Sequence, residues 1–214
     1  ITLGLIFGGG ALFALLEWNN PGTIGNLTPG GKILASLFQS VTLRTAGFAS
    51  FNQDALTEAS KVLSDLLMFV GGSSGSTAGG VKTVTMGLVV LSAISTMRGR
   101  RQVTVFGRSI SQEDIANAVS IALLVMGLSL LGAAVITVCD GCSFMNAIYE
   151  TISALCTVGL TTGITPTLCT ASKLILIVFM FFGRVGIMTI GVGFMMGDRA
   201  KERVQYAQTK VMIG

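Results

Sequence analysis

Apolar residues fall into five long runs separated by polar stretches, and this pattern predicts a chain built of helices. The runs cover residues 1–18, 57–70, 83–97, 115–139 and 174–197. At 1.5 Å of rise per residue, the first and fourth runs are long enough for a helix that crosses a bilayer. The second is shorter and contains Lys61 and Asp65, so we expect it to cross only together with the third.

A stretch without bulky side chains separates the second and third runs. It reads Gly71-Gly-Ser-Ser-Gly-Ser-Thr-Ala-Gly-Gly80, a composition with little tendency to stay helical. One straight helix over 57–97 would reach about 60 Å, about twice the thickness of the hydrocarbon layer. Non-helical backbone persists at membrane depth only where protein buries it or where it lines a water-filled cavity. We therefore expect an intramembrane loop over 71–80.

Two shorter apolar segments, Lys32 to Thr42 and Phe144 to Leu155, lie between the long runs. Each is too short to cross the membrane, and each is followed by a Thr-x-Gly sequence. They predict either helices on the outer surface or re-entrant pore helices that dip into the membrane.

An internal repeat favours the pore helices. Two pairs of blocks are 112 positions apart: Thr45–Phe48 with Thr157–Leu160, and Phe69–Gly71 with Phe181–Gly183. A block just upstream, Phe38–Thr42, matches Tyr149–Ser153 at an offset of 111. A constant offset over separated blocks indicates a repeated unit, here span, short helix, Thr-x-Gly turn and span. Both copies run in the same direction, which fits a pore better than the inverted halves of many transporters.

Composition places these helices in a membrane. The 214 residues are 51% hydrophobic and 11% charged, with a mean hydropathy of +0.77. Soluble proteins are about 25% charged, so an ordinary soluble domain is excluded. Ile1 opens directly inside an apolar run, without Met or a basic leader, so we expect no cleavable signal and a fragment of a longer chain.

The net charge of +4 is unevenly distributed. Cations gather in two stretches that flank apolar runs, at 98–108 and 199–210, and the positive-inside rule places both in the cytoplasm. Cations in such positions do not form the basic face of a soluble domain, so nucleic-acid binding is not expected. Four acids fall on the predicted outer side, where they either attract cations or are ordinary solvated charges: Glu17, Asp54, Glu58 and Asp140.

The sequence offers no pattern for an enzyme or a metal centre. It contains no His, and Cys139-Asp-Gly-Cys142 is a CxxC without a second pair. Asp65 is the only acid expected inside a span, which leaves no acid–base or nucleophile set. We therefore expect neither catalysis nor a bound cofactor.

The Thr-x-Gly turns suit an alkali cation. A re-entrant helix that ends at such a turn directs the negative end of its dipole at the occupant. Backbone carbonyls can replace the water around the ion, and Gly permits the φ angles that this requires. Two glycine helix caps are the alternative, which the repetition disfavours. The expected carbonyl ligands are those of Thr45, Ala46, Gly47, Thr157, Val158 and Gly159.

Two cations, Lys82 and Arg184, lie within membrane segments, where a buried charge is costly and usually functional. The repeat offset places Arg184 opposite Gly72, and we expect a gate below the filter. Its expected residues are Gly71, Gly72, Ser73, Ser74, Gly75, Ser76, Thr77, Ala78, Gly79, Gly80, Lys82 and Arg184. Alternatives are snorkelling of Lys82 to the interface and hydrogen bonds from Arg184 that stabilise a helix contact. An ion pair between Glu150 and Arg44 is a further hypothesis.

These motifs resemble the Trk/Ktr/HKT superfamily of potassium uptake proteins, in particular the C-terminal half of a Ktr-type (KtrB-like) membrane subunit. Leu43 stands where the family usually has Pro. Phe38–Phe48 resembles the third filter of the family, Thr157–Gly163 the fourth filter and Gly71–Thr83 the gating loop. Phe182–Gly186 resembles its cavity-arginine motif, and Lys210–Gly214 resembles its C-terminus.

The resemblance implies an all-α membrane protein with two parallel span–pore helix–filter–span repeats, half of a four-repeat K+-channel-like pore. Residues 1–98 would be the third repeat with the intramembrane loop, and 99–112 would be a cytoplasmic basic linker. Residues 113–197 would be the fourth repeat, and 198–214 would be a cytoplasmic tail. The implied function is K+ uptake through a carbonyl filter gated by the loop and an arginine, with Na+ dependence left open.

The resemblance also implies a multi-pass protein of the bacterial inner membrane with a cytoplasmic C-terminus. Implied partners are the first two repeats of the pore, a second membrane subunit in a homodimer, the bilayer and a cytosolic RCK-type (KtrA-like) ring. The ring would bind nucleotide and dock on the basic stretches, and no cofactor is implied in this chain. Two alternatives remain: a secondary transporter of a small solute with re-entrant hairpins, and a Na+-permeable member of the same family.

Overall fold

The computed structural model describes residues 1–185 except 74, 77, 100–101 and 106–107. The named elements of the described chain are helices and one short antiparallel pair of strands, β1 (Thr104–Val105) and β2 (Arg108–Ser109). The helices are α1 (Thr2–Glu17), α2 (Pro29–Thr42), α3 (Glu58–Phe69), α4 (Thr83–Met97), α5 (Gln112–Asp140), α6 (Phe144–Leu155) and α7 (Thr170–Val185). Two 3-10 helices are η1 (Gln53–Ala55) and η2 (Thr165–Thr167).

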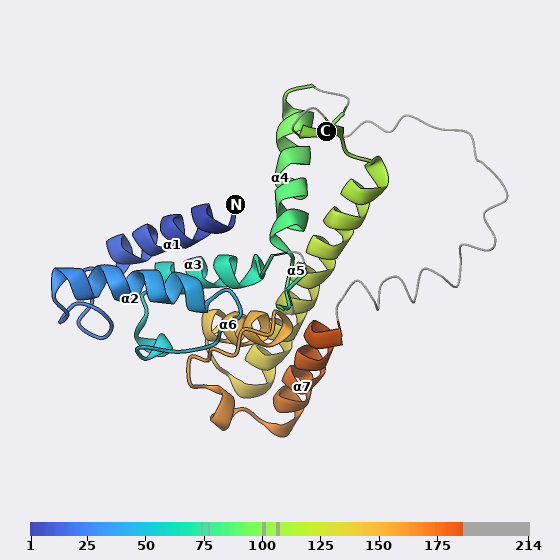
Figure 1. Ribbon diagram of the computed structural model, residues 1–214. Coiled ribbons are helices and arrows are strands. Elements are labelled where there is room, and N and C mark those ends of the chain that lie inside the picture. The colour runs from blue at the N-terminus through green and yellow to red at the C-terminus, as the bar shows by residue number, and fades with distance from the viewer. Residues whose placement is uncertain (74, 77, 100–101, 106–107, 186–214) are drawn as a thin grey trace.

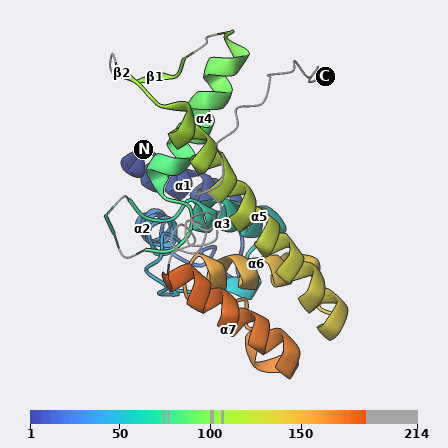
Figure 2. The same ribbon diagram turned by 90° about the vertical axis from the view of Figure 1, so that its right-hand side faces the viewer.

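The helices pack in two groups. In the first, α1 packs against α2 and α3; in the second, α5 packs against α6 and α7 (Figure 1). The groups meet where α3 contacts α6, and α4 rises beside the first half of α5 (Figure 2). The central core lies where these groups meet, with buried Phe13, Met68, Val125 and Leu155.

Local sequence explains where the helices start and stop. Thr28 accepts a hydrogen bond from Gly31 N and Pro29 occupies the first turn of α2, which is a favourable start. Thr57 and Ser111 cap α3 and α5 in the same way. Gly141, in the left-handed conformation, ends α5.

The predicted helices agree closely with the observed ones. The second short helix has the predicted bounds, and the first begins at Pro29 rather than Lys32 because Thr28 and Pro29 start it earlier. The second and third apolar runs form separate helices, α3 and α4, with the glycine-rich stretch between them. The pair of strands within 99–112 was not predicted.

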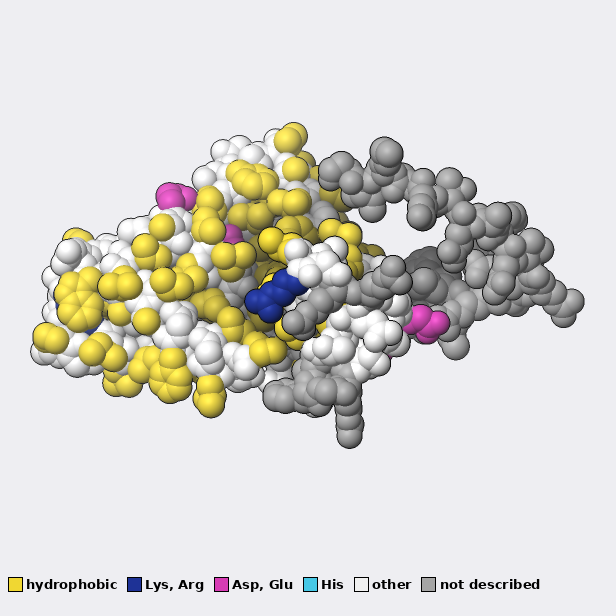
Figure 3. Space-filling view, turned by 90° about the horizontal axis from the view of Figure 1, so that it is seen from above, with side chains coloured by type: hydrophobic (Ala, Val, Ile, Leu, Met, Phe, Trp, Pro, Cys, Tyr) yellow, Lys and Arg dark blue, Asp and Glu magenta, His cyan; other side chains and the backbone are white. Residues whose placement is uncertain are grey.

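Helix α5 is long and apolar enough to cross a membrane, and α1 and α4 are shorter apolar helices. Hydrophobic side chains spread over much of the described surface in Figure 3, where charged side chains occupy only a few places. The part of the fifth apolar run beyond Val185, and the C-terminal basic stretch, lie outside the described residues.

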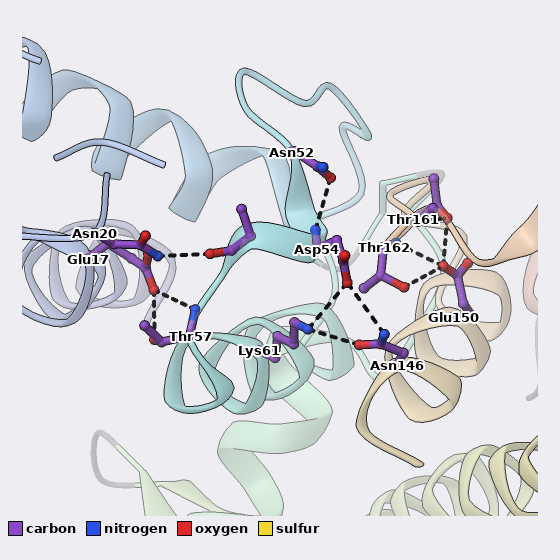
Figure 4. Close-up of polar contacts among 12 residues, drawn as sticks. Glu17, Asn20, Asn52, Asp54, Thr57, Lys61, Asn146, Glu150, Thr161 and Thr162 are labelled. Carbon is purple, nitrogen blue, oxygen red and sulfur yellow. Dashed lines mark hydrogen bonds and ion pairs between the residues drawn. The ribbon is translucent and has the colours of Figure 1, made fainter. Parts of the chain in front are cut away.

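Glu17 is not a solvated acid, so that expectation is wrong for this residue. Its side chain at the end of α1 is 1% exposed. Figure 4 shows it among its polar partners. One carboxylate oxygen accepts from the amide and hydroxyl of Thr57, at 3.0 and 2.7 Å, and the other from Asn20 and Thr23, at 2.6 and 2.7 Å. The carboxylate therefore joins the end of α1 to the start of α3.

We expect Glu17→Ala to lower the free energy of unfolding by about 3 kcal/mol, because four hydrogen bonds to a buried carboxylate are lost. Glu58→Ala is the matched control, since Glu58 is exposed in the same region. It should change stability by only about 0.5 kcal/mol. Thermal unfolding of the purified protein in detergent measures both. Equal melting temperatures for the two variants would contradict the assignment.

Candidate functional site

Helices α2 and α6, the two predicted pore helices, each end in a turn with an unusual backbone. Thr45 and Thr157 have φ angles of +69° and +55°, and Gly47 and Gly159 have φ angles of +79° and +89°. Left-handed backbone is costly for a β-branched residue such as Thr. Residues in this region persist where the surrounding structure fixes them, which happens most often at functional sites.

Hydrogen bonds to the preceding helices and to the following residues hold both turns in place. Ala46 N and Gly47 N donate to the carbonyl of Thr42, and Val158 N donates to the carbonyl of Ser153. The hydroxyl of Thr42 donates to the carbonyl of Phe48 at 2.7 Å, and the hydroxyl of Ser153 donates to the carbonyl of Leu160 at 2.6 Å. Both hydroxyls lie at matched positions of the repeat, and each holds the residue that follows the glycine.

The carbonyls of the two turns remain available. In the part of the chain that the structure describes, no hydrogen bond ends on the carbonyl oxygens of the six predicted ligands. These are the carbonyl oxygens of Thr45, Ala46, Gly47, Thr157, Val158 and Gly159.

The two turns lie side by side, although they are far apart in sequence. A Cβ atom added to Gly47 would overlap the carbonyl oxygen of Val158, and one added to Gly159 would lie 3.8 Å from the Cα of Gly47. The C-terminal ends of α2 and α6 therefore meet at one place, and their dipoles combine there in favour of a cation.

The glycine-rich stretch forms a loop whose two ends are joined to each other by hydrogen bonds. Val70 and Val81 form a parallel bridge, and Gly71 N donates to the carbonyl of Val81 at 2.9 Å. Lys82 Nζ folds back onto this loop and donates to the carbonyls of Ser76, at 3.0 Å, and Ala78. The ammonium group of Lys82 therefore binds the loop instead of extending away from it. The predicted gate residues Ser74 and Thr77 lie outside the described residues.

Both ends of the loop contact the turns. Gly79 N donates to the hydroxyl of Thr157 at 3.0 Å, and Arg44 Nη2, next to Thr45, donates to the carbonyl of Gly71 at 3.1 Å. The predicted loop and the predicted carbonyl ligands thus belong to one contiguous site.

Arg184 follows a residue in close contact with the second turn. A Cβ atom added to Gly183 would overlap the carbonyl of Leu155 and lie 2.8 Å from Cγ2 of Thr157. Helix α7 therefore approaches the backbone at the end of α6, with Arg184 at the next position of the chain.

The hypothesis of an ion pair between Glu150 and Arg44 is wrong. Glu150 accepts hydrogen bonds from Thr161, Thr162 and Thr165, as Figure 4 shows for the first two. The guanidinium group of Arg44 instead binds the backbone carbonyls of Thr2 and Gly71. Glu150 thus binds the segment that follows its own helix, whereas Arg44 reaches the start of α1 and the loop that follows α3.

Sequence reasoning missed three buried polar residues near the site: Gln39, Gln53 and Tyr149. A signal was present, because Gln39 and Glu150 are polar residues of apolar helices at matched positions of the repeat. Among the described residues, no three His, Cys, Asp or Glu side chains could share a metal ion, and all four cysteines are free.

Comparison with known proteins gives consistent matches over nearly the whole chain. The sequence model of the TrkH family, described as a cation transport protein, matches residues 5–202. Ktr system potassium uptake protein B of Bacillus subtilis (strain 168) is 39% identical over 200 residues, which are 94% of this chain and 44% of that protein. Potassium/sodium uptake protein NtpJ of Enterococcus hirae is 34% identical over 220 residues, 100% of this chain and 48% of that protein.

The chain spans about half the length of the curated relatives that it matches. The crystal structure of the potassium transporter TrkH from Vibrio parahaemolyticus has the same fold over 94% of this chain and 44% of its own. The TM-score is 0.72 and the sequence identity is 20%.

Proposed function

Because this chain belongs to the TrkH family of cation transport proteins, a family of membrane transporters and not of enzymes, we propose that it forms half of a pore for K+ uptake. The observation that carries the proposal is the set of unbonded carbonyls in two adjacent turns. Carbonyl oxygens replace the hydration shell of a K+ ion without a charged ligand. The names of two relatives, a potassium uptake protein and a potassium/sodium uptake protein, agree with this substrate.

The filter ligands are the carbonyls of Thr45, Ala46, Gly47, Thr157, Val158 and Gly159. Matched φ angles and matched hydroxyl contacts from Thr42 and Ser153 support two parallel repeats, 1–98 and 113–197. The linker 99–112 and the tail 198–214 would face the cytoplasm, because both carry the positive stretches.

Two turns surround only half of an ion, so the pore requires two further repeats. The half-length match to the relatives supports a partner half that supplies them. A homodimer of complete membrane subunits on a cytosolic nucleotide-binding ring, in a bacterial inner membrane, completes the proposed assembly. K+ is the transported ion, and no other bound group is proposed in this chain.

The proposed gate consists of the loop 71–80, Lys82 and Arg184. Contacts from Gly79 to Thr157 and from Arg44 to Gly71 support a position of the loop directly against the filter. A cation held beside the ion path raises the barrier for K+ until the loop moves.

The test is uptake of 86Rb+ into liposomes that contain the complete pore around this chain, with and without excess Na+. We expect Gly159→Ser to lower the preference for Rb+ over Na+ by about tenfold, because Ser is strained at a φ angle of +89°. A Cβ atom at this position would make only an ordinary contact, 3.8 Å from the Cα of Gly47, so the variant should fold.

Absence of Rb+ uptake by the wild-type pore would contradict the proposed function and favour a transporter of small solutes. Uptake that is indifferent to Gly159→Ser would contradict the filter. The second candidate is a Na+-permeable pore, which the name of the Enterococcus relative favours. Equal uptake of 22Na+ and 86Rb+ by the wild type would establish it.

A further inference from the structure

Among the buried polar side chains of each proposed pore helix is one amide or carboxylate whose role the filter leaves unexplained. Gln39 in α2 is fully buried, and Glu150 in α6 is 5% exposed. The two residues occupy matched positions, at the offset of 111 that relates the two pore helices. Buried polar groups of this kind need partners, and these partners lie in the segments that follow the two turns.

Gln39 holds the segment after the first turn. Its Nε2 donates to Oε1 of Gln53 at 2.6 Å, and the hydroxyl of Tyr149 in α6 donates to the same oxygen at 3.1 Å. Nε2 of Gln53 donates back to the carbonyl of Phe51 at 3.0 Å. Gln53 is 2% exposed, so this segment is tied to both pore helices by buried hydrogen bonds.

Glu150 holds the segment after the second turn more strongly. One carboxylate oxygen accepts from the hydroxyl of Thr161 at 2.6 Å and from the amide and hydroxyl of Thr162 at 2.8 and 3.1 Å. The other oxygen accepts from the hydroxyl of Thr165 at 2.8 Å. Hydrogen bonds to a charged acceptor are shorter and stronger than neutral ones.

The held segments begin where the filter turns end. Phe48 and Leu160, which follow Gly47 and Gly159, are fixed by the hydroxyls of Thr42 and Ser153. The backbone after each filter glycine is thus held by a hydroxyl and, further along, by Glu150 directly or by Gln39 through the side chain of Gln53. A shift of either segment changes where the carbonyls of Gly47 and Gly159 point.

We propose that Gln39 and Glu150 are positioning residues that set ion selectivity, because they fix the outer end of the two filter turns. This inference rests on the proposed function. Selectivity depends on the spacing and number of the carbonyl dipoles around the ion, so small displacements of the turns affect it. A merely structural role would lower the amount of folded protein and leave selectivity unchanged.

The experiment measures the ratio of 86Rb+ to 22Na+ uptake by liposomes that contain the complete pore, at equal amounts of folded protein. We expect Glu150→Ala and Gln39→Leu to lower this ratio by about tenfold. Glu150→Gln keeps one acceptor oxygen for Thr161 and Thr162, and its amide nitrogen can donate to the hydroxyl of Thr165, so it should lower the ratio by less than about threefold. This partial rescue distinguishes hydrogen bonding from charge, and a Gln variant as poor as the Ala variant would overturn the hydrogen-bond mechanism.

A second pair of variants changes only the held segment and keeps the test valid if Glu150→Ala fails to fold. Thr165→Val removes one hydrogen bond to Glu150 and should lower the ratio by about fivefold. Thr167→Val, in the same 3-10 helix, is the control, because this exposed hydroxyl donates only to the carbonyl of Ile164. Equal ratios for these two variants would overturn the proposal, whereas absence of Rb+ uptake by the wild type would overturn the proposed function instead.

Discussion

Gly47→Ala is expected to reduce K+ flux by about a hundredfold, which is a larger effect than we expect for Gly159→Ser. Two costs act together. The φ angle of +79° is strained for Ala, and the added Cβ would overlap the carbonyl oxygen of Val158. That carbonyl is a proposed ligand in the other turn, so the substitution displaces both filter turns. A combined cost of about 3 kcal/mol corresponds to about a hundredfold change.

Uptake of 86Rb+ by the complete pore measures this effect. Gly30→Ala is the matched control, since it lies in the same pore helix, has open space around its Cβ position and should retain wild-type flux. Gly159→Ser serves as an intermediate case because its Cβ atom would meet no clash, while its φ angle is strained. Retention of flux by Gly47→Ala would show that the two turns do not form one ion site.

Arg184→Gln is expected to raise ion flux by about tenfold in the absence of a regulator. Arg184 directly follows Gly183, and Gly183 is the residue that contacts the end of α6 and Thr157. A tenfold change corresponds to about 1.4 kcal/mol, which is the size expected for a partly screened repulsion between two like charges. Removal of this charge lowers the barrier for a cation that leaves the filter.

Arg184→Lys separates the electrostatic role from a structural one. The Lys variant keeps the charge and loses the planar donor geometry, so it should stay close to the wild type if the charge is what matters. A role in stabilising a helix contact predicts instead that both variants reduce the amount of folded protein. Unchanged flux in Arg184→Gln would rule out the gate.

The sequence was sufficient to predict the main elements of the fold. Hydrophobic run lengths predicted separate helices on both sides of the Gly71–Gly80 stretch, because a run of Gly and Ser residues cannot be held in a long apolar helix. The bounds Phe144–Leu155 were predicted correctly, since the apolar segment is followed directly by the turn. The repeat offset drew attention to the two Thr-x-Gly turns, which the structure brings side by side.

Side-chain partners could not be predicted in the same way. Glu17 was expected in solvent, yet it accepts hydrogen bonds from Thr57 and Asn20. A carboxylate at a helix end binds whichever donors the fold brings close to it. Glu150 and Arg44 have opposite charges, but Glu150 binds nearby hydroxyl and amide groups, whereas Arg44 binds backbone carbonyls of two other segments. Such choices depend on distances within a few ångströms, which spacing along the chain does not encode.

The joined ends of the loop 71–80 have a consequence for the speed of its motion. Because the bridge between Val70 and Val81 fixes the ends of α3 and α4 to each other, the intervening residues can change conformation while both helices stay in place. Motions of short loops take about nanoseconds to microseconds, whereas collective displacements of helices take about microseconds to milliseconds. Conduction in the proposed pore is therefore expected to switch at the speed of a few backbone torsions, without waiting for a transmembrane helix to move.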